Sequence, residues 1–142
     1  MIKEAYSTTN FPFPDAWRVD NLVFISGQVS VTADGEVLGY GDIEVQTRTT
    51  YENLQRVLDK VGCTFKDLVK LNTYLVFDGS DEEFSEFWAT MARVRQEFLP
   101  EPGPTATAMR VAGLALPGLL IEIDGIAVLP VQSPARQEGI YD

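Results

Sequence analysis

The stretch GLLIEIDGIAVLP, residues 118–130, is almost entirely aliphatic, yet it contains two acids, Glu122 and Asp124. An apolar run of this kind, bounded by Gly and Pro, predicts a buried strand that other elements must cover. Side chains two residues apart on a strand point to the same face, so both acids share a face with Leu120 and Ile126. Buried carboxylates are costly unless something pairs with them or uses them. The two acids therefore mark a candidate functional site.

The rest of the pattern predicts the order β-β-α-β-α-β-β. One helix is expected over residues 42–61, with Gly62 as its stop, and a second from a capping box at Ser80 to the prolines that begin at Pro100. Strands are expected over the ranges 17–31 (two strands), 68–77, 105–111 and 119–128. This order indicates an α+β domain with its helices on one face of a mixed sheet.

The domain organisation is predicted to be simple. A chain of 142 residues can bury the core of one domain, and it shows no internal repeat and no linker. We expect a single domain over residues 1–130, followed by a polar tail, VQSPARQEGIYD, over residues 131–142. The tail is expected to be frayed or to reach a neighbouring subunit.

The composition argues against several kinds of site and partner. The chain has no histidine and a single cysteine, Cys63, so no zinc or copper site is expected and the thiol is predicted to be buried and inert. Eleven Lys and Arg against 21 Asp and Glu give a formal charge of −10 without a basic stripe, which argues against nucleic acid. No apolar run approaches the roughly 20 residues that span a membrane, and the N-terminus does not resemble a signal peptide. We expect a cytoplasmic protein with no membrane partner, because a lone cysteine suits a reducing compartment.

Four segments, in the same order and spacing, resemble the RidA/YjgF family, also called L-PSP endoribonuclease-like. They are NLVFISGQVSV (21–31), QTRTTYENLQRVLDKVG (46–62), DLVKLNTYLV (67–76) and LLIEIDGIAV (119–128), and the resemblance runs over residues 5–129. It implies a chorismate-mutase-like α+β fold assembled as a homotrimer, with small-molecule ligands bound in clefts between subunits. It also implies hydrolysis of reactive enamines and imines, such as 2-aminoacrylate, without a metal or a cofactor.

The resemblance gives Glu122 a catalytic role, because this position holds the family glutamate that orients the attacking water. An imine carbon is already electrophilic, so a held water and one acid–base group suffice. Burial in a partly apolar cleft raises the pKa of a glutamate, which lets it exchange protons near neutral pH. Asp124 would fall outside the reacting region and is interpreted as structural. The alternative for Glu122, from the chain alone, is an ion-paired or solvent-facing strand carboxylate.

Other cleft positions depart from the family pattern. Active deaminases carry an arginine after a proline at the head of the penultimate strand, where it clamps the substrate carboxylate. In GPTATAMRV that position is Ala106. Phe13 stands where a cleft tyrosine is usual, Trp88 where those deaminases have an asparagine, and Ala108 where a cysteine is common.

These replacements predict a pocket with aromatic walls and no charged anchor, which favours a neutral or ring-bearing ligand. The alternative is that both aromatic side chains simply belong to the core. The family's Ser26 and Gly27 are retained and are candidate binding residues. Arg110 lies four residues beyond Ala106 on the same strand face, roughly 13 Å away. It is a further candidate ligand contact, or else the partner of an acid.

The leading prediction is therefore an enamine or imine hydrolase whose substrate is not a small free amino-acid derivative. The alternative is a non-catalytic trimer that binds a small molecule or a partner protein. Ribonuclease activity, attributed to some members of the family, is disfavoured by the charge and by the absence of histidine. The strand VKLNTYLVF (69–77) has apolar residues on both faces, which agrees with cover from a neighbouring subunit on one side.

Overall fold

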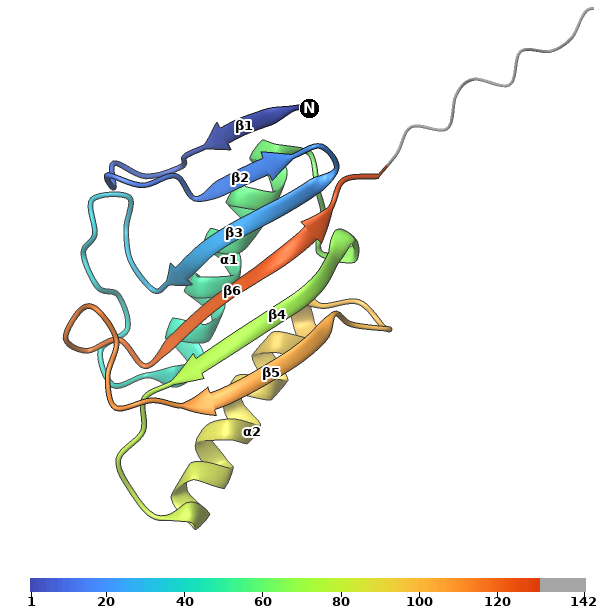
Figure 1. Ribbon diagram of the computed structural model, residues 1–142. Helices are drawn as coiled ribbons and strands as arrows, with labels where there is room; N and C mark the ends of the chain where they lie inside the picture. Colours follow the sequence, from blue (N-terminus) through green and yellow to red (C-terminus); the bar gives the residue numbers. More distant parts are fainter. Residues whose placement is uncertain (131–142) are drawn as a thin grey trace, which may run out of the picture.

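A computed structural model describes residues 1–130 as one six-stranded sheet with two long helices on one of its faces (Figure 1). The elements in chain order are β1 (Lys3–Tyr6), β2 (Ala16–Val19), β3 (Leu22–Val29), α1 (Ile43–Val61), a 3-10 turn (Phe65–Asp67), β4 (Leu68–Leu75), α2 (Asp81–Phe98), β5 (Thr105–Arg110) and β6 (Ile121–Val128). The strand order is β1-β2-β3-β6-β4-β5, antiparallel throughout except for the parallel pair β4 and β5. The predicted α+β class and mixed sheet are confirmed. The predicted tail, residues 131–142, lies outside the described residues.

The helices begin and end at the predicted signals. The Asp42 carboxylate accepts the Val45 N–H at 3.1 Å at the start of α1, and Gly62 ends the helix in the left-handed region at φ 89°. At the start of α2, the Ser80 Oγ accepts the Glu83 N–H and the Glu83 carboxylate accepts the Ser80 N–H. These ends could be predicted because each one depends on side chains within a few residues of it.

The strands differ from the prediction mainly at β1, β4 and β6. β1 was not expected, since its sequence KEAY is short and largely exposed, and it is a strand only through its pairing with β2. β4 ends at Leu75 and β6 begins at Ile121, so each is shorter than its apolar run. The central position of β6 between β3 and β4 agrees with its aliphatic sequence.

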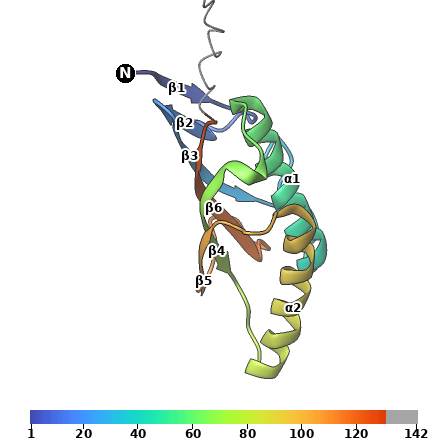
Figure 2. The same ribbon diagram turned by 90° about the vertical axis from the view of Figure 1, so that its right-hand side faces the viewer.

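The side view in Figure 2 shows both helices on one side of the sheet, and the buried residues of the core lie between these two layers. On β6 the residues alternate between buried and partly exposed, with Ile121, Ile123 and Ala127 buried against the helices. Glu122 and Asp124 therefore point to the opposite, open face of the sheet, as their spacing predicted.

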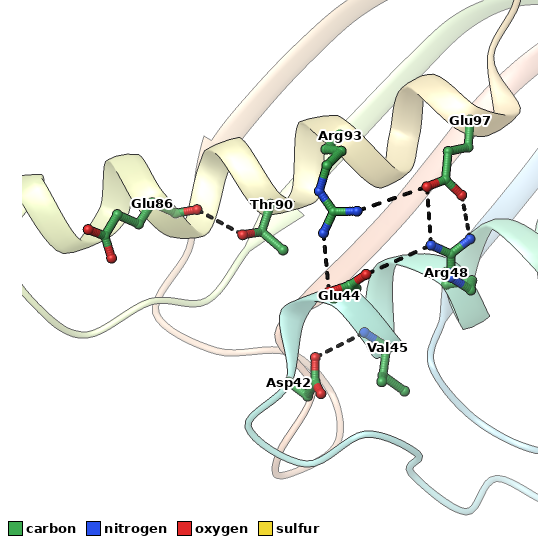
Figure 3. Close-up of polar contacts among 8 residues, drawn as sticks. All are labelled: Asp42, Glu44, Val45, Arg48, Glu86, Thr90, Arg93 and Glu97. Atoms are coloured by element: carbon green, nitrogen blue, oxygen red, sulfur yellow. Dashed lines mark hydrogen bonds and ion pairs between the residues drawn. The ribbon is translucent and has the colours of Figure 1, made fainter.

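The two helices also contact each other. At their surface, Arg48 of α1 forms hydrogen bonds to both carboxylate oxygens of Glu97 of α2, and the Arg93 Nη2 lies 3.1 Å from the Glu44 Oε2 (Figure 3). These side chains are close to half exposed, so solvent screens the attraction and each pair contributes little to stability. Beneath them the rings of Tyr51 and Phe98 stack with centroids 5.3 Å apart, and such packing contributes more than the surface ions.

The open face of the sheet is part apolar and part polar. The largest exposed apolar side chains of β2 and β3 are Trp17, Leu22 and Phe24, each 40–44% exposed. On β4 the residues opposite the two acids are Asn72 and Tyr74, so the middle of that strand's open face is polar. Within residues 1–130, neither helix is long and apolar enough to cross a membrane.

Candidate functional site

Glu122 lies near the middle of the open face, between β3 and β4. Its register neighbour on β4 is Tyr74, while a bulge in β3 interrupts the pairing with β6 and leaves Gly27 against the Glu122 side chain. A Cβ built on Gly27 would lie 2.8 Å from the Glu122 Cδ and 2.9 Å from its Oε1. Only glycine at this position leaves the carboxyl group where it is.

The surroundings of Glu122 change its acidity. The side chain is half-buried, and this burial raises the pKa of its carboxyl group, with a smaller contribution from the negative charge of Asp124. A carboxyl group with a raised pKa holds its proton closer to neutral pH, which is the property that a general acid–base group requires.

Asp124 has two partners that the sequence analysis missed. The Asn72 Nδ2 donates to its Oδ1 at 2.8 Å, and the Tyr74 hydroxyl donates to its Oδ2 at 2.9 Å. Both donors come from β4, where Asn72 is the register neighbour of Asp124. These partners lie 50 or more residues away in the chain, so no local pattern signals them.

Three of the predicted residues meet at a second place, between β5 and α2. Trp88, Ala108 and Arg110 line a hollow of about 290 Å³, whose other lining residues are Leu75, Phe84 and Met109. Trp88 is 37% exposed, so it does not belong to the core. The guanidinium carbon of Arg110 lies 4.4 Å from the centroid of the Phe84 ring, and its Nη1 lies 3.5 Å from the Asp81 Oδ1. Arg110 thus has an acidic partner, which was one of the two predictions for this residue.

The remaining predicted residues lie outside the hollow between β5 and α2. Ala106 lies on the helix-facing side of β5, opposite the buried Leu71, and does not line the hollow. Phe13 is in the loop between β1 and β2 and is 52% exposed. The Ser26 Oγ donates to the Pro14 carbonyl oxygen at 2.8 Å and so ties this loop to β3, beside Gly27.

Within one chain, the site around Glu122 and Gly27 lies apart from the hollow that Trp88, Ala108 and Arg110 line. β6 and β4 separate β3 from β5 in the sheet (Figure 1). Glu122 faces away from the helices, whereas Trp88 and Arg110 lie on the helix side. A cleft that contains both groups would require a second copy of the chain.

Another hollow, of about 420 Å³, adjoins Gly27 and is lined by α1, the loop before β2 and the segment after β3. Two of its polar lining groups already have hydrogen-bond partners. The Asp15 carboxylate accepts hydrogen bonds from Thr8, and the Asn53 amide donates to the carbonyl oxygens of Val29 and Val31. Gly27 lines this hollow but Glu122 does not, so the hollow lies beside the candidate site without containing its carboxyl group.

Cys63 lies outside both groups and is 2% exposed. Burial raises the pKa of its thiol to about 11, and only the thiolate reacts with alkylating agents. We expect no adduct when the native protein is treated with iodoacetamide near pH 8, and one adduct per chain after unfolding in guanidinium chloride, as counted by intact-mass spectrometry. Stoichiometric labelling of the native protein would show that this thiol is accessible.

The sequence and the structure were compared with those of known proteins. The family model described as Endoribonuclease L-PSP matches residues 4–129. A RutC family protein of Pyrococcus abyssi is 31% identical over 132 residues, which cover 89% of this chain and 98% of the relative. The 3-aminoacrylate deaminase RutC of Acinetobacter baylyi is 31% identical over 116 residues, covering 82% and 86%. The crystal structure of RidA from an Antarctic Psychrobacter matches with a TM-score of 0.71 at 27% identity, covering 88% of this chain and 94% of that one.

Proposed function

Because the chain belongs to the Endoribonuclease L-PSP family, which is also the RidA/YjgF family, we propose that it is a cofactor-independent hydrolase of small enamines or imines. The observation that carries the proposal is the half-buried Glu122, whose carboxyl group lies over Gly27 and whose pKa is raised by burial. A relative named as a 3-aminoacrylate deaminase supports the same class of reaction.

Hydrolysis of an enamine or imine requires one group that can take up and release a proton. An enamine becomes an iminium ion when its carbon takes up a proton from solvent. Water then attacks the iminium carbon, and the Glu122 carboxylate takes a proton from that water as the carbon–oxygen bond forms, which gives a neutral carbinolamine. Glu122 returns this proton to the nitrogen, ammonia leaves, and the hydroxyl group loses its proton to water as the carbonyl product forms. A carboxyl group whose pKa is raised by burial can perform both transfers more readily than an ordinary exposed one.

The proposed cleft lies between the subunits of a homotrimer. Two observations support such an assembly: Trp17, Leu22 and Phe24 leave apolar surface exposed on the open face, and the two groups of site residues are separate within one chain. A neighbouring copy that covers the open face could bury that surface and bring its own hollow between β5 and α2 towards Glu122. Sedimentation equilibrium tests the assembly, and a monomer at micromolar concentration would remove the cleft from the proposal.

The substrate is proposed to be neutral or ring-bearing near the reacting carbon. Ala106 cannot bind a carboxylate, and the cation on the same strand face, Arg110, already contacts Phe84 and Asp81. The hollow beside it is walled by Phe84 and Trp88. An aromatic wall without a free bidentate arginine favours an apolar group over the carboxylate of 2-aminoacrylate.

A coupled assay for ammonia tests the proposal. Freshly generated 2-aminoacrylate is compared with imines that carry uncharged or aromatic groups, and spontaneous hydrolysis in buffer is subtracted. We expect kcat/KM to be at least about tenfold higher for the ring-bearing imines, since complementary pockets discriminate by factors of that order. Trp88→Ala should reduce this preference. Equal turnover of 2-aminoacrylate would contradict the proposed specificity.

The second candidate is a non-catalytic binding module, and the observation that favours it is Ala106 at the clamp position. It predicts that a small molecule stays bound through purification and that no imine in the panel is hydrolysed faster than in buffer. Ribonuclease activity is not proposed, because a formal charge of −10 opposes binding of a polyanion.

A further inference from the structure

Asp124 is held at both carboxylate oxygens by side chains of β4. Asn72 donates to Oδ1 and Tyr74 donates to Oδ2, at 2.8 and 2.9 Å. The hydrogen bond to Asp124 raises the pKa of the Tyr74 hydroxyl, so Tyr74 keeps its proton and remains a donor. A carboxylate accepts at both oxygens and donates at neither, so this arrangement fits the ionised form of Asp124.

Glu122 has different surroundings on the same face of the same strand. The two residues are two positions apart, which places their Cα atoms roughly 6.6 Å from each other at ordinary strand rise. The Glu122 carboxyl group packs over Gly27 and, within residues 1–130, has no pair of donors like that of Asp124. The two neighbouring carboxyl groups therefore have unlike environments: the Asp124 oxygens accept from two donors of β4, whereas the Glu122 carboxyl group is half-buried over Gly27.

We propose that Asp124 is a positioning residue: held by Asn72 and Tyr74, it presents a fixed negative charge to Glu122 and makes Glu122 the member of the pair that exchanges the proton. This inference rests on the proposed function and gives Asp124 more than the structural role expected from the sequence. Asp124 does not touch the substrate in this scheme. It acts by opposing the second negative charge that would form if Glu122 lost its proton.

The other groups that face Glu122 do not replace Asp124 in this role. From β4, Tyr74 is protonated, and Lys70 is separated from Glu122 by the Asp124–Asn72 pair. From β3, Gly27 and the register neighbour Val29 carry no charge, and beyond Tyr74 the β5 residue is Met109. Burial raises the pKa of the Glu122 carboxyl group, and the negative charge of Asp124 raises it further, as the proposal requires.

Titration of Glu122 in the full-length protein tests the inference directly. The side-chain Cδ resonance, labelled with 13C and assigned from its loss in Glu122→Gln, is followed against pH in the wild type and in Asp124→Asn. We expect the midpoint to move to lower pH in Asp124→Asn. The matched control is Glu36→Gln, which removes one negative charge from an exposed loop position and should leave the midpoint unchanged. Coincident midpoints in Asp124→Asn and the wild type would overturn the inference.

Two further measurements keep the result interpretable. Thermal melts establish that the variants fold, and Asp124→Thr, a strand-forming residue without charge, replaces Asp124→Asn if the latter does not. The titration needs no turnover, so a shifted midpoint without ammonia release would reject the hydrolase and keep the carboxyl pair. If turnover is observed, kcat/KM is also measured against pH. In Asp124→Asn its acid limb should move to lower pH by the same amount as the titration midpoint of Glu122. If the titration midpoint of Glu122 shifts but the acid limb of the kcat/KM profile does not move, the proposed role of Asp124 in catalysis is contradicted.

Discussion

Replacing Glu122 with glutamine is expected to lower kcat for the best imine substrate by about 10²–10⁴-fold, the range that a general acid–base group contributes. The amide keeps the shape of the side chain over Gly27 but cannot take up a proton from water. Because a half-buried group is cheaper to bury when it is neutral, the thermal midpoint should stay the same or rise. Ammonia release and circular-dichroism melts of the two proteins measure both effects. Unchanged turnover would contradict the mechanism and favour the binding module.

Gly27→Ala tests the same carboxyl group by moving it. The added Cβ would meet the Glu122 Cδ at 2.8 Å, and the far end of that flexible side chain can shift at little cost in stability. A displacement of about 1 Å at a reacting group can cost about 10²-fold in rate, so activity should fall while the free energy of unfolding barely changes. The matched control is Gly113→Ala, where an added Cβ meets nothing within 4 Å. If Gly27→Ala is as active as this control, the position of the carboxyl group is not critical.

Gly125→Ala is expected to destabilise the fold by about 3 kcal/mol or to prevent folding, because the new methyl group has no room. Its Cβ would lie 2.4 Å from the backbone oxygen of Lys70, where β6 runs beside β4. Unlike the Glu122 side chain, a strand backbone cannot move aside without losing ladder hydrogen bonds on the central strand. Urea unfolding followed by tryptophan fluorescence measures the effect.

Gly113→Ala again serves as the control for Gly125→Ala, since it makes the same chemical change in open space. Its unfolding midpoint should match that of the wild type. A free energy of unfolding for Gly125→Ala within about 0.5 kcal/mol of this control, the size of an ordinary surface substitution, would show that β4 and β6 can separate locally without cost.

The features that could be predicted from the sequence are those set by neighbours along the chain. The ends of both helices follow from Asp42, Gly62 and the pair Ser80 and Glu83, whose effects act within one helical turn. The central strand β6 follows from its aliphatic run. The shared face of Glu122 and Asp124 follows from the two-residue period of a strand, which needs no knowledge of the partner strands.

The surroundings of those two acids were decided by the tertiary structure alone. Pairing of β4 with β6 brings Asn72 and Tyr74 to Asp124, and the bulge in β3 brings Gly27 to Glu122. Strand order and register also account for β1, which exists through its pairing with β2, and for the hollow between β5 and α2. They separate the predicted cleft residues into two groups. A local pattern determines which face a side chain takes, whereas its partners depend on strand order and register. These are selected by packing over the whole sheet, at separations where the local sequence carries no signal.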